Sequence, residues 1–158
     1  MCSSDLFLLS AFCLAQTAPQ HAHDVQMRGA KGMGFSQTAT THHFLLAKDG
    51  GVIQVEANDP KDAQSRDQVR MHLEHIARAF AAGDFNIPMF VHDRNVPGTA
   101  TMARLKSDIT YKYEKTTKGG RVNISTGNPE TLAAVHDFLV FQIKDHGTGD
   151  PVSLKEKH

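Results

Sequence analysis

Alternating hydrophobic and polar positions predict two pairs of strands. Between Ile109 and Lys115, and again between Arg121 and Thr126, apolar or aromatic residues alternate with polar ones. A period of two is typical of a strand that buries one face. The segments 41–47 and 52–57 predict an earlier pair, and a Gly-Gly sequence that favours a hairpin turn separates the strands of each pair.

A helical pattern follows each pair of strands. Apolar residues recur three or four positions apart in both patterns: Val69, Leu73, Ile76 and Phe80 in the first, and Leu132, Val135, Leu139 and Ile143 in the second. Gly119 follows Gly50 by 69 positions, and Pro129 follows Pro60 by the same interval. We therefore predict an internal repeat over 41–82 and 109–146.

This repeat predicts the fold class. Two ββα units bury their apolar helix faces if both helices pack on the same side of one sheet. We expect an α+β fold, a two-layer sandwich of duplicated ββα units, with a four-stranded antiparallel sheet and two helices on one face. The domain should span 39–147, with an irregular connection over 84–108 that holds a short helix near Met102.

The two ends of the chain have a different composition. Phe7 to Ala15 is an apolar run of signal-peptide length, so residues 1–15 predict a secretory leader and a periplasmic or secreted protein. Residues 1–6 lack the usual basic start and have the character of a sequencing-adapter artefact. We expect a flexible arm or a loosely docked segment over 16–38 and a mobile tail over 148–158.

The amino-acid composition limits the kinds of partner and site that the protein can have. Lysine plus arginine and aspartate plus glutamate each number 17, so the balanced charge argues against a nucleic-acid or anionic-membrane partner. Both cysteines, Cys2 and Cys13, lie in the expected leader, which leaves the mature chain without thiolate ligands or disulfides. No nucleophile or phosphate-loop motif is present, so the sequence favours a binding protein over an enzyme, with no catalytic residue to name.

Ten histidines are the unusual feature of the composition. Strand alternation places His42 on the inward face and His43 on the outward one, while His72 and His136 lie on the apolar faces of the two helices. Imidazole binds copper and zinc well, and three histidines with an open position are typical of a labile metal site. The predicted metal ligands are His42, His72 and His136, with His75, His92 or His146 completing or replacing one of them.

Other interpretations of these histidines remain open. A histidine at the edge of an apolar face is more often a hydrogen-bonded structural residue, which would leave a non-metal interaction module or a small-ligand pocket. Copper is favoured slightly over zinc by the export context and the available methionines. Asp137 and Glu74 are candidates to accept the far ring N–H of ligating histidines.

Two further expectations concern relatives and partners. The segments Met33-Gly34-Phe35, Thr40 to Phe44, Phe138 to His146 and Thr148-Gly149-Asp150 resemble short exported proteins of unknown function from environmental bacteria. The resemblance covers nearly the whole mature domain and implies no activity. Phe138, Val140 and Phe141 widen the apolar surface of the second helix, which indicates either deeper burial or a homodimer interface.

Overall fold

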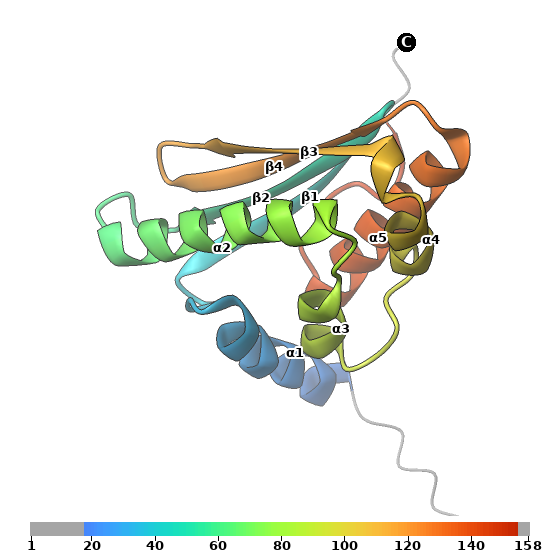
Figure 1. Ribbon diagram of the computed structural model, residues 1–158. Helices are drawn as coiled ribbons and strands as arrows, with labels where there is room; N and C mark the ends of the chain where they lie inside the picture. The colour runs from blue at the N-terminus through green and yellow to red at the C-terminus, as the bar shows by residue number, and fades with distance from the viewer. Residues whose placement is uncertain (1–17, 155–158) are drawn as a thin grey trace, which may run out of the picture.

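A four-stranded antiparallel sheet and five α-helices make up the computed structural model, which describes residues 18–154 (Figure 1). The strands are β1 (Thr40–Ala47), β2 (Gly50–Ala57), β3 (Ile109–Lys115) and β4 (Gly119–Thr126). The helices are α1 (Ala18–Met33), α2 (Ala63–Ala81), α3 (Asn86–His92), α4 (Thr99–Arg104) and α5 (Pro129–His146), with a 3-10 turn, η1, over Lys106–Asp108. The predicted α+β class is confirmed.

The two hairpins join through their second strands. The sheet order is β1-β2-β4-β3, with β2 and β4 antiparallel at the centre. Ala47 pairs with Gly50, so Lys48 and Asp49 form the turn and both glycines belong to β2. Close approach explains a glycine at position 51, because a Cβ there would overlap the Leu139 side chain and the Leu45 carbonyl oxygen.

Both long helices cover the same face of the sheet (Figure 1). Helix α2 packs mainly on β3 and β4, whereas α5 packs mainly on β1 and β2. Each helix therefore covers the hairpin of the other half of the chain. The order strand–strand–helix occurs in both halves, as predicted, while descent of the halves from one duplicated unit stays a prediction.

Caps set the bounds of these helices. The Asp62 side chain accepts a hydrogen bond from Ser65 N at the start of α2, and Asn128 does the same for Glu130 N at the start of α5. Gly147 ends α5 in the left-handed conformation at φ 62°. These signals lie in the sequence, so both long helices begin and end close to their predicted positions.

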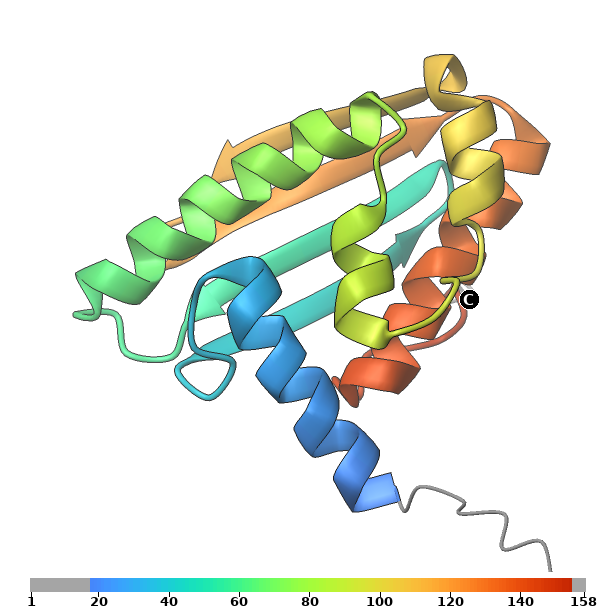
Figure 2. The same cartoon turned by 60° about the horizontal axis from the view of Figure 1, so that its bottom comes forward.

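The expected flexible arm over 16–38 is wrong for most of its length, because residues 18–33 form helix α1. Contacts with the rest of the fold hold this helix in place. Val25 is buried, the Arg28 side chain donates to the carbonyl oxygen of Val91, and His21 bonds to Asp145. Figure 2 shows α1 and α3 side by side over the gap between α2 and α5. Tertiary contacts, which a local pattern does not reveal, hold this segment in place.

Two other segments are also better ordered than predicted. Helix α3 occupies the start of the connection expected to be irregular, since Pro88 falls in its first turn, where proline is tolerated. In the expected mobile tail, the Asp150 carboxylate accepts hydrogen bonds from Phe44 N and His43 Nδ1, both at 3.0 Å. The tail thereby covers part of the outer edge of β1.

Burial within the chain accounts for the wide apolar surface of α5. Phe138 is 1% exposed and lies edge-on against the rings of both Phe80 and Phe85, and Phe141 lies edge-on against His92. The first of the two explanations, deeper burial, therefore holds, and a homodimer stays a prediction. Across residues 18–154, no helix combines the length and apolar character needed to cross a membrane. The expected leader lies outside the described residues.

Candidate histidine-lined site

Four histidines line one cavity of about 50 Å³ between the sheet and its helices. His42 comes from β1, His72 from α2, His92 from α3 and His146 from α5. The remaining lining side chains are mostly apolar: Met33, Phe44, Ile53, Val55, Leu73, Ile76, Phe80, Ile87, Pro88, Val91, Phe138 and Gln142. Since a single water needs ~10–15 Å³, the cavity has room for an ion or a very small molecule.

The histidine rings form a continuous chain. His42 and His146 are stacked, with centroids 5.4 Å apart and planes 16° apart, and His92 lies edge-on to His146 at 5.0 Å. Phe35 connects His72 to this group, because its ring is 5.8 Å from that of His42 and 5.4 Å from that of His72. One strand and three helices thus bring together imidazoles that are far apart in the sequence.

Burial keeps three of these imidazoles neutral. Desolvation lowers the pKa of His42 to about 4 and that of His72 to about 4, with smaller effects of neighbouring histidines. It lowers the pKa of His146 to about 3, further reduced by His42 and His92 and partly offset by Asp145. Each ring therefore keeps a nitrogen lone pair at neutral pH, which is the form that binds metals.

The imidazole of His42 is also short of hydrogen bonds. Its Nε2 is buried and has no partner among residues 18–154. A buried polar atom left unsatisfied costs about 1–3 kcal/mol. Such an atom on the wall of a cavity indicates that something other than the described protein atoms is meant to contact it.

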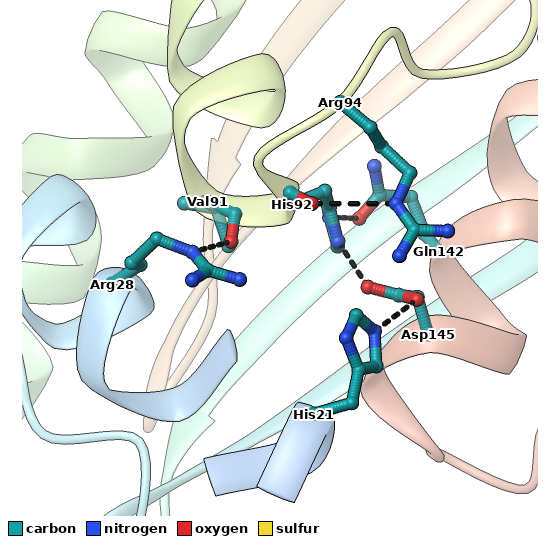
Figure 3. A network of polar contacts seen from close by, with 7 residues as sticks. All are labelled: His21, Arg28, Val91, His92, Arg94, Gln142 and Asp145. Atoms are coloured by element: carbon teal, nitrogen blue, oxygen red, sulfur yellow. Dashed lines mark hydrogen bonds and ion pairs between the residues drawn. The ribbon is translucent and has the colours of Figure 1, made fainter. Parts of the chain in front are cut away.

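The carboxylate of Asp145 orients the ring of His92. Figure 3 shows Asp145 between two histidines: Oδ2 lies 2.5 Å from His92 Nδ1, and Oδ1 lies 2.9 Å from His21 Nε2. Because an ionised carboxylate only accepts, both ring nitrogens donate to it. Burial by itself raises the pKa of Asp145, but the hydrogen bonds from His21 and His92 outweigh it and hold this pKa below its usual value.

The other nitrogen of His92 points to Gln142 (Figure 3), with Nε2 at 2.9 Å from the amide oxygen. Two states satisfy this contact. If the amide oxygen accepts, both ring nitrogens carry protons and His92 is an imidazolium paired with Asp145. If the amide group is turned round, its NH₂ donates to a neutral His92. In both states the two ring nitrogens of His92 are occupied by Asp145 and Gln142, so His92 has no free lone pair for the cavity.

The structure separates the six predicted ligands into two sets. His42, His72, His92 and His146 line the cavity, but His136 and His75 do not. His136 Nε2 lies 2.9 Å from the carbonyl oxygen of Ala47 and 3.1 Å from that of Gly50, so it holds α5 against the first hairpin turn. His75 is exposed on α2. The three expected core ligands are therefore not gathered at one point.

The carboxylates predicted to support the ligands also lie elsewhere. Glu74 bonds to Arg78 on the exposed side of α2, and Asp137 is exposed on α5. The carboxylate that bonds to a cavity histidine is Asp145 instead. Helical spacing offered a signal for it, because Asp145 follows Gln142 by three positions and directly precedes His146. His21 and Met33 are residue types that bind metals, but the arm that carries them shows no periodic pattern, so the sequence did not predict where their side chains lie.

Within the part of the chain that the structure describes, no three His, Cys, Asp or Glu side chains are arranged to hold a metal ion. The cavity gathers histidines without converging their nitrogens. Comparison of the chain with family models, with curated proteins and with solved structures yields no match. The chemistry of the site therefore has to be argued from its own residues.

Proposed function

We propose that this protein binds one transition-metal ion, copper or zinc, at the histidine-lined cavity. The observation that carries the proposal is the buried, unpartnered Nε2 of His42, stacked on His146 at the wall of a cavity with room for an ion. Neutral imidazoles are good ligands for both metals. The ligand set is His42, His72 and His146, and it replaces the set that included His136.

The surroundings of the ligand set also bear on the proposal. His92 donates Nδ1–H to Asp145 and lies edge-on to the ligand His146 at 5.0 Å, so it holds one side of that ring in place. The lining rings come from four separate elements, and metal binding would require the rings of His72 and His146 to turn until their nitrogens converge with that of His42. Metal binding is expected to be accompanied by such rotations.

The role we propose is metal capture or transfer rather than catalysis, because the site offers ligands but no nucleophile. A leader over residues 1–15 would place this activity in the periplasm or outside the cell. Export and metal capture are compatible, since neutral buried histidines bind metal without any cysteine, which an oxidising compartment would oxidise.

Elemental analysis of the full-length, untagged protein tests the proposal. The protein is incubated with copper or zinc, passed through a desalting column, and compared with a His42→Phe/His146→Phe variant. The control is His23→Ala/His75→Ala, which removes two exposed histidines and leaves the cavity intact. We expect one metal ion per chain in the wild type and the control, and none in the cavity variant.

Circular dichroism of all three proteins establishes that each is folded before metal is added. Equal metal content in the cavity variant and the control would assign binding to surface histidines and overturn the proposal. The absence of bound metal from the folded wild type would overturn it as well.

A small uncharged ligand is a second candidate, favoured by the apolar walls and by the lack of a preformed metal geometry. His42 Nε2 would then bond to a polar atom of that ligand. Native mass spectrometry of the purified protein distinguishes the two candidates. An organic adduct that disappears in the cavity variant, without any metal, would establish the second one.

A further inference from the structure

The walls of the cavity carry no negative charge. Its polar lining residues are the four histidines and Gln142, and neither a carboxylate nor a thiolate is among the described residues that line it. Asp145, the nearest acidic group, has one oxygen bonded to His92 and the other to His21. A cation that enters the cavity would therefore meet imidazole nitrogens, the Gln142 amide and the Met33 thioether, and no anionic ligand.

Neutral walls discriminate between ions of different charge. The free-energy cost of moving an ion from water into an apolar interior grows with the square of its charge. This desolvation cost is therefore about four times larger for a dication than for a monocation of equal size. Divalent ions in proteins usually recover this cost from anionic ligands or a bound hydroxide. This cavity provides no anionic side chain to do so.

A thioether lies at the same cavity. Met33, the last residue of α1, is half-buried and lines the cavity together with His42 and His72. Thioether sulfur is a soft donor that selects Cu(I) over Zn(II) and other divalent ions. The other methionine of this helix, Met27, is 63% exposed and is not part of the lining.

The number of ligands that the cavity offers also favours Cu(I) over Zn(II). Zinc in proteins takes four ligands in a tetrahedron, yet no three ionisable or imidazole ligands are arranged for a metal among residues 18–154. Cu(I) has a filled d shell and a single charge, and two or three soft ligands satisfy it. His42, His146 and Met33 line the same cavity and offer two nitrogens and one sulfur, which meets that lower requirement once the stacked rings have turned toward one ion.

We propose that the cavity is selective for a monovalent soft cation, Cu(I), over divalent copper or zinc, with His42, His146 and Met33 as its ligands and Met33 in the place given above to His72. This inference rests on the proposed metal-binding function and names its substrate. It assigns to Met33 a ligand role and to helix α1 a share in the binding site. The copper is taken up and released without a change of oxidation state, so no electron donor is required.

The test compares affinities for two metals in one protein. Full-length, untagged protein is titrated without oxygen against a chromogenic Cu(I) chelator, and separately against a chromogenic Zn(II) chelator. We expect Cu(I) to bind at least about a thousandfold more tightly than Zn(II), a difference of about 4 kcal/mol. Ag(I), which is monovalent and redox-inert, should compete with Cu(I) for the same site.

A pair of methionine variants locates the sulfur ligand. Met33→Leu preserves volume and should weaken Cu(I) binding by about tenfold or more while leaving Zn(II) binding unchanged. Met27→Leu on the same helix should change neither. The unfolding midpoints of both variants show whether α1 stays folded.

The outcomes separate the two proposals. Zn(II) binding as tight as Cu(I), or a Met33→Leu variant with unchanged Cu(I) affinity, would overturn the selectivity while leaving metal binding in place. Failure of Cu(I), Ag(I) and Zn(II) alike to bind would overturn the proposed function itself.

Discussion

At the scale of single residues, the histidine cluster is a site where stability and binding are opposed. The three rings of His42, His72 and His146 are buried without charge, and His42 Nε2 has no hydrogen bond within the described chain. An apolar ring in place of His42 would satisfy the core better. The imidazole at this position therefore lowers the stability of the metal-free fold.

The lowered pKa values predict how stability depends on acidity. The folded protein keeps His42 neutral down to a pH of about 4, whereas an unfolded histidine takes up a proton near pH 6.5. Below pH 6.5 the unfolded state therefore binds more protons, and stability falls as the pH decreases from about 6.5 toward 4. For His42 alone the loss at pH 5 is about 2 kcal/mol.

Urea unfolding of the metal-free protein at pH 7.5 and pH 5 measures this loss. The His42→Phe variant should be more stable than the wild type at pH 7.5 by about 1 kcal/mol and should lose less stability at pH 5. The neighbouring His43→Phe change serves as the control, because it removes a hydrogen bond to Asp150 and should not stabilise the protein. A His42→Phe variant with the wild-type pH dependence would show that the buried ring does not set it.

At the scale of the elements, the first hairpin joins the sheet to the helix that carries His146. Gly51 lies where β2 runs between Leu45 of β1 and Leu139 of α5. His136 of α5 reaches the same turn through the carbonyl oxygens of Ala47 and Gly50. The hairpin therefore fixes the position of α5 relative to β1, and with it the distance between His146 and His42.

Substitution of this glycine tests that dependence. Gly51→Ala should destabilise the protein by about 1–3 kcal/mol, because the added methyl group overlaps both the Leu139 side chain and backbone. Gly127→Ala is the matched control, since nothing lies within 4 Å of a Cβ at that position. Thermal unfolding followed by circular dichroism compares the two variants, and equal midpoints would contradict the close packing of β2 and α5.

At the scale of the whole molecule, the halves of the chain are interlocked. Helix α2 of the first half packs on β3 and β4, while α5 of the second packs on β1 and β2. The histidine-lined cavity follows from this arrangement, because α5 of the second half places His146 beside the lining residues of β1, α2 and α3 in the first half. Neither half contains a complete apolar core or a complete site.

Fragments test this interdependence. We expect residues 1–98 and 99–158, produced separately, to be largely unfolded, because each helix lacks the strands that it covers. Mixed in equal amounts, they should regain the far-ultraviolet circular dichroism of the intact chain. A fragment that unfolds cooperatively on its own would show that its ββα unit is an independent domain.

Local patterns in the sequence determined the four strands and the two long helices. Alternation in 109–115 and helical spacing in α2 and α5 each reflect one buried face, and such periods are visible without any tertiary information. The same alternation directed His42 inward and His43 outward. Four of the six candidate ligands line one cavity because the inward-facing positions of neighbouring elements meet in a single core.

The tertiary structure alone decided the rest of the site. Strand order placed His136 at the hairpin turn instead of the cavity, and no local pattern encodes which strands a helix will cover. Helix α1 has few apolar residues and is held by Val25, Arg28 and His21 against α3 and α5, so its order depends on partners distant in sequence. The positions of Met33 and Asp145 at the site likewise depend on contacts between segments distant in sequence, which no local pattern predicts.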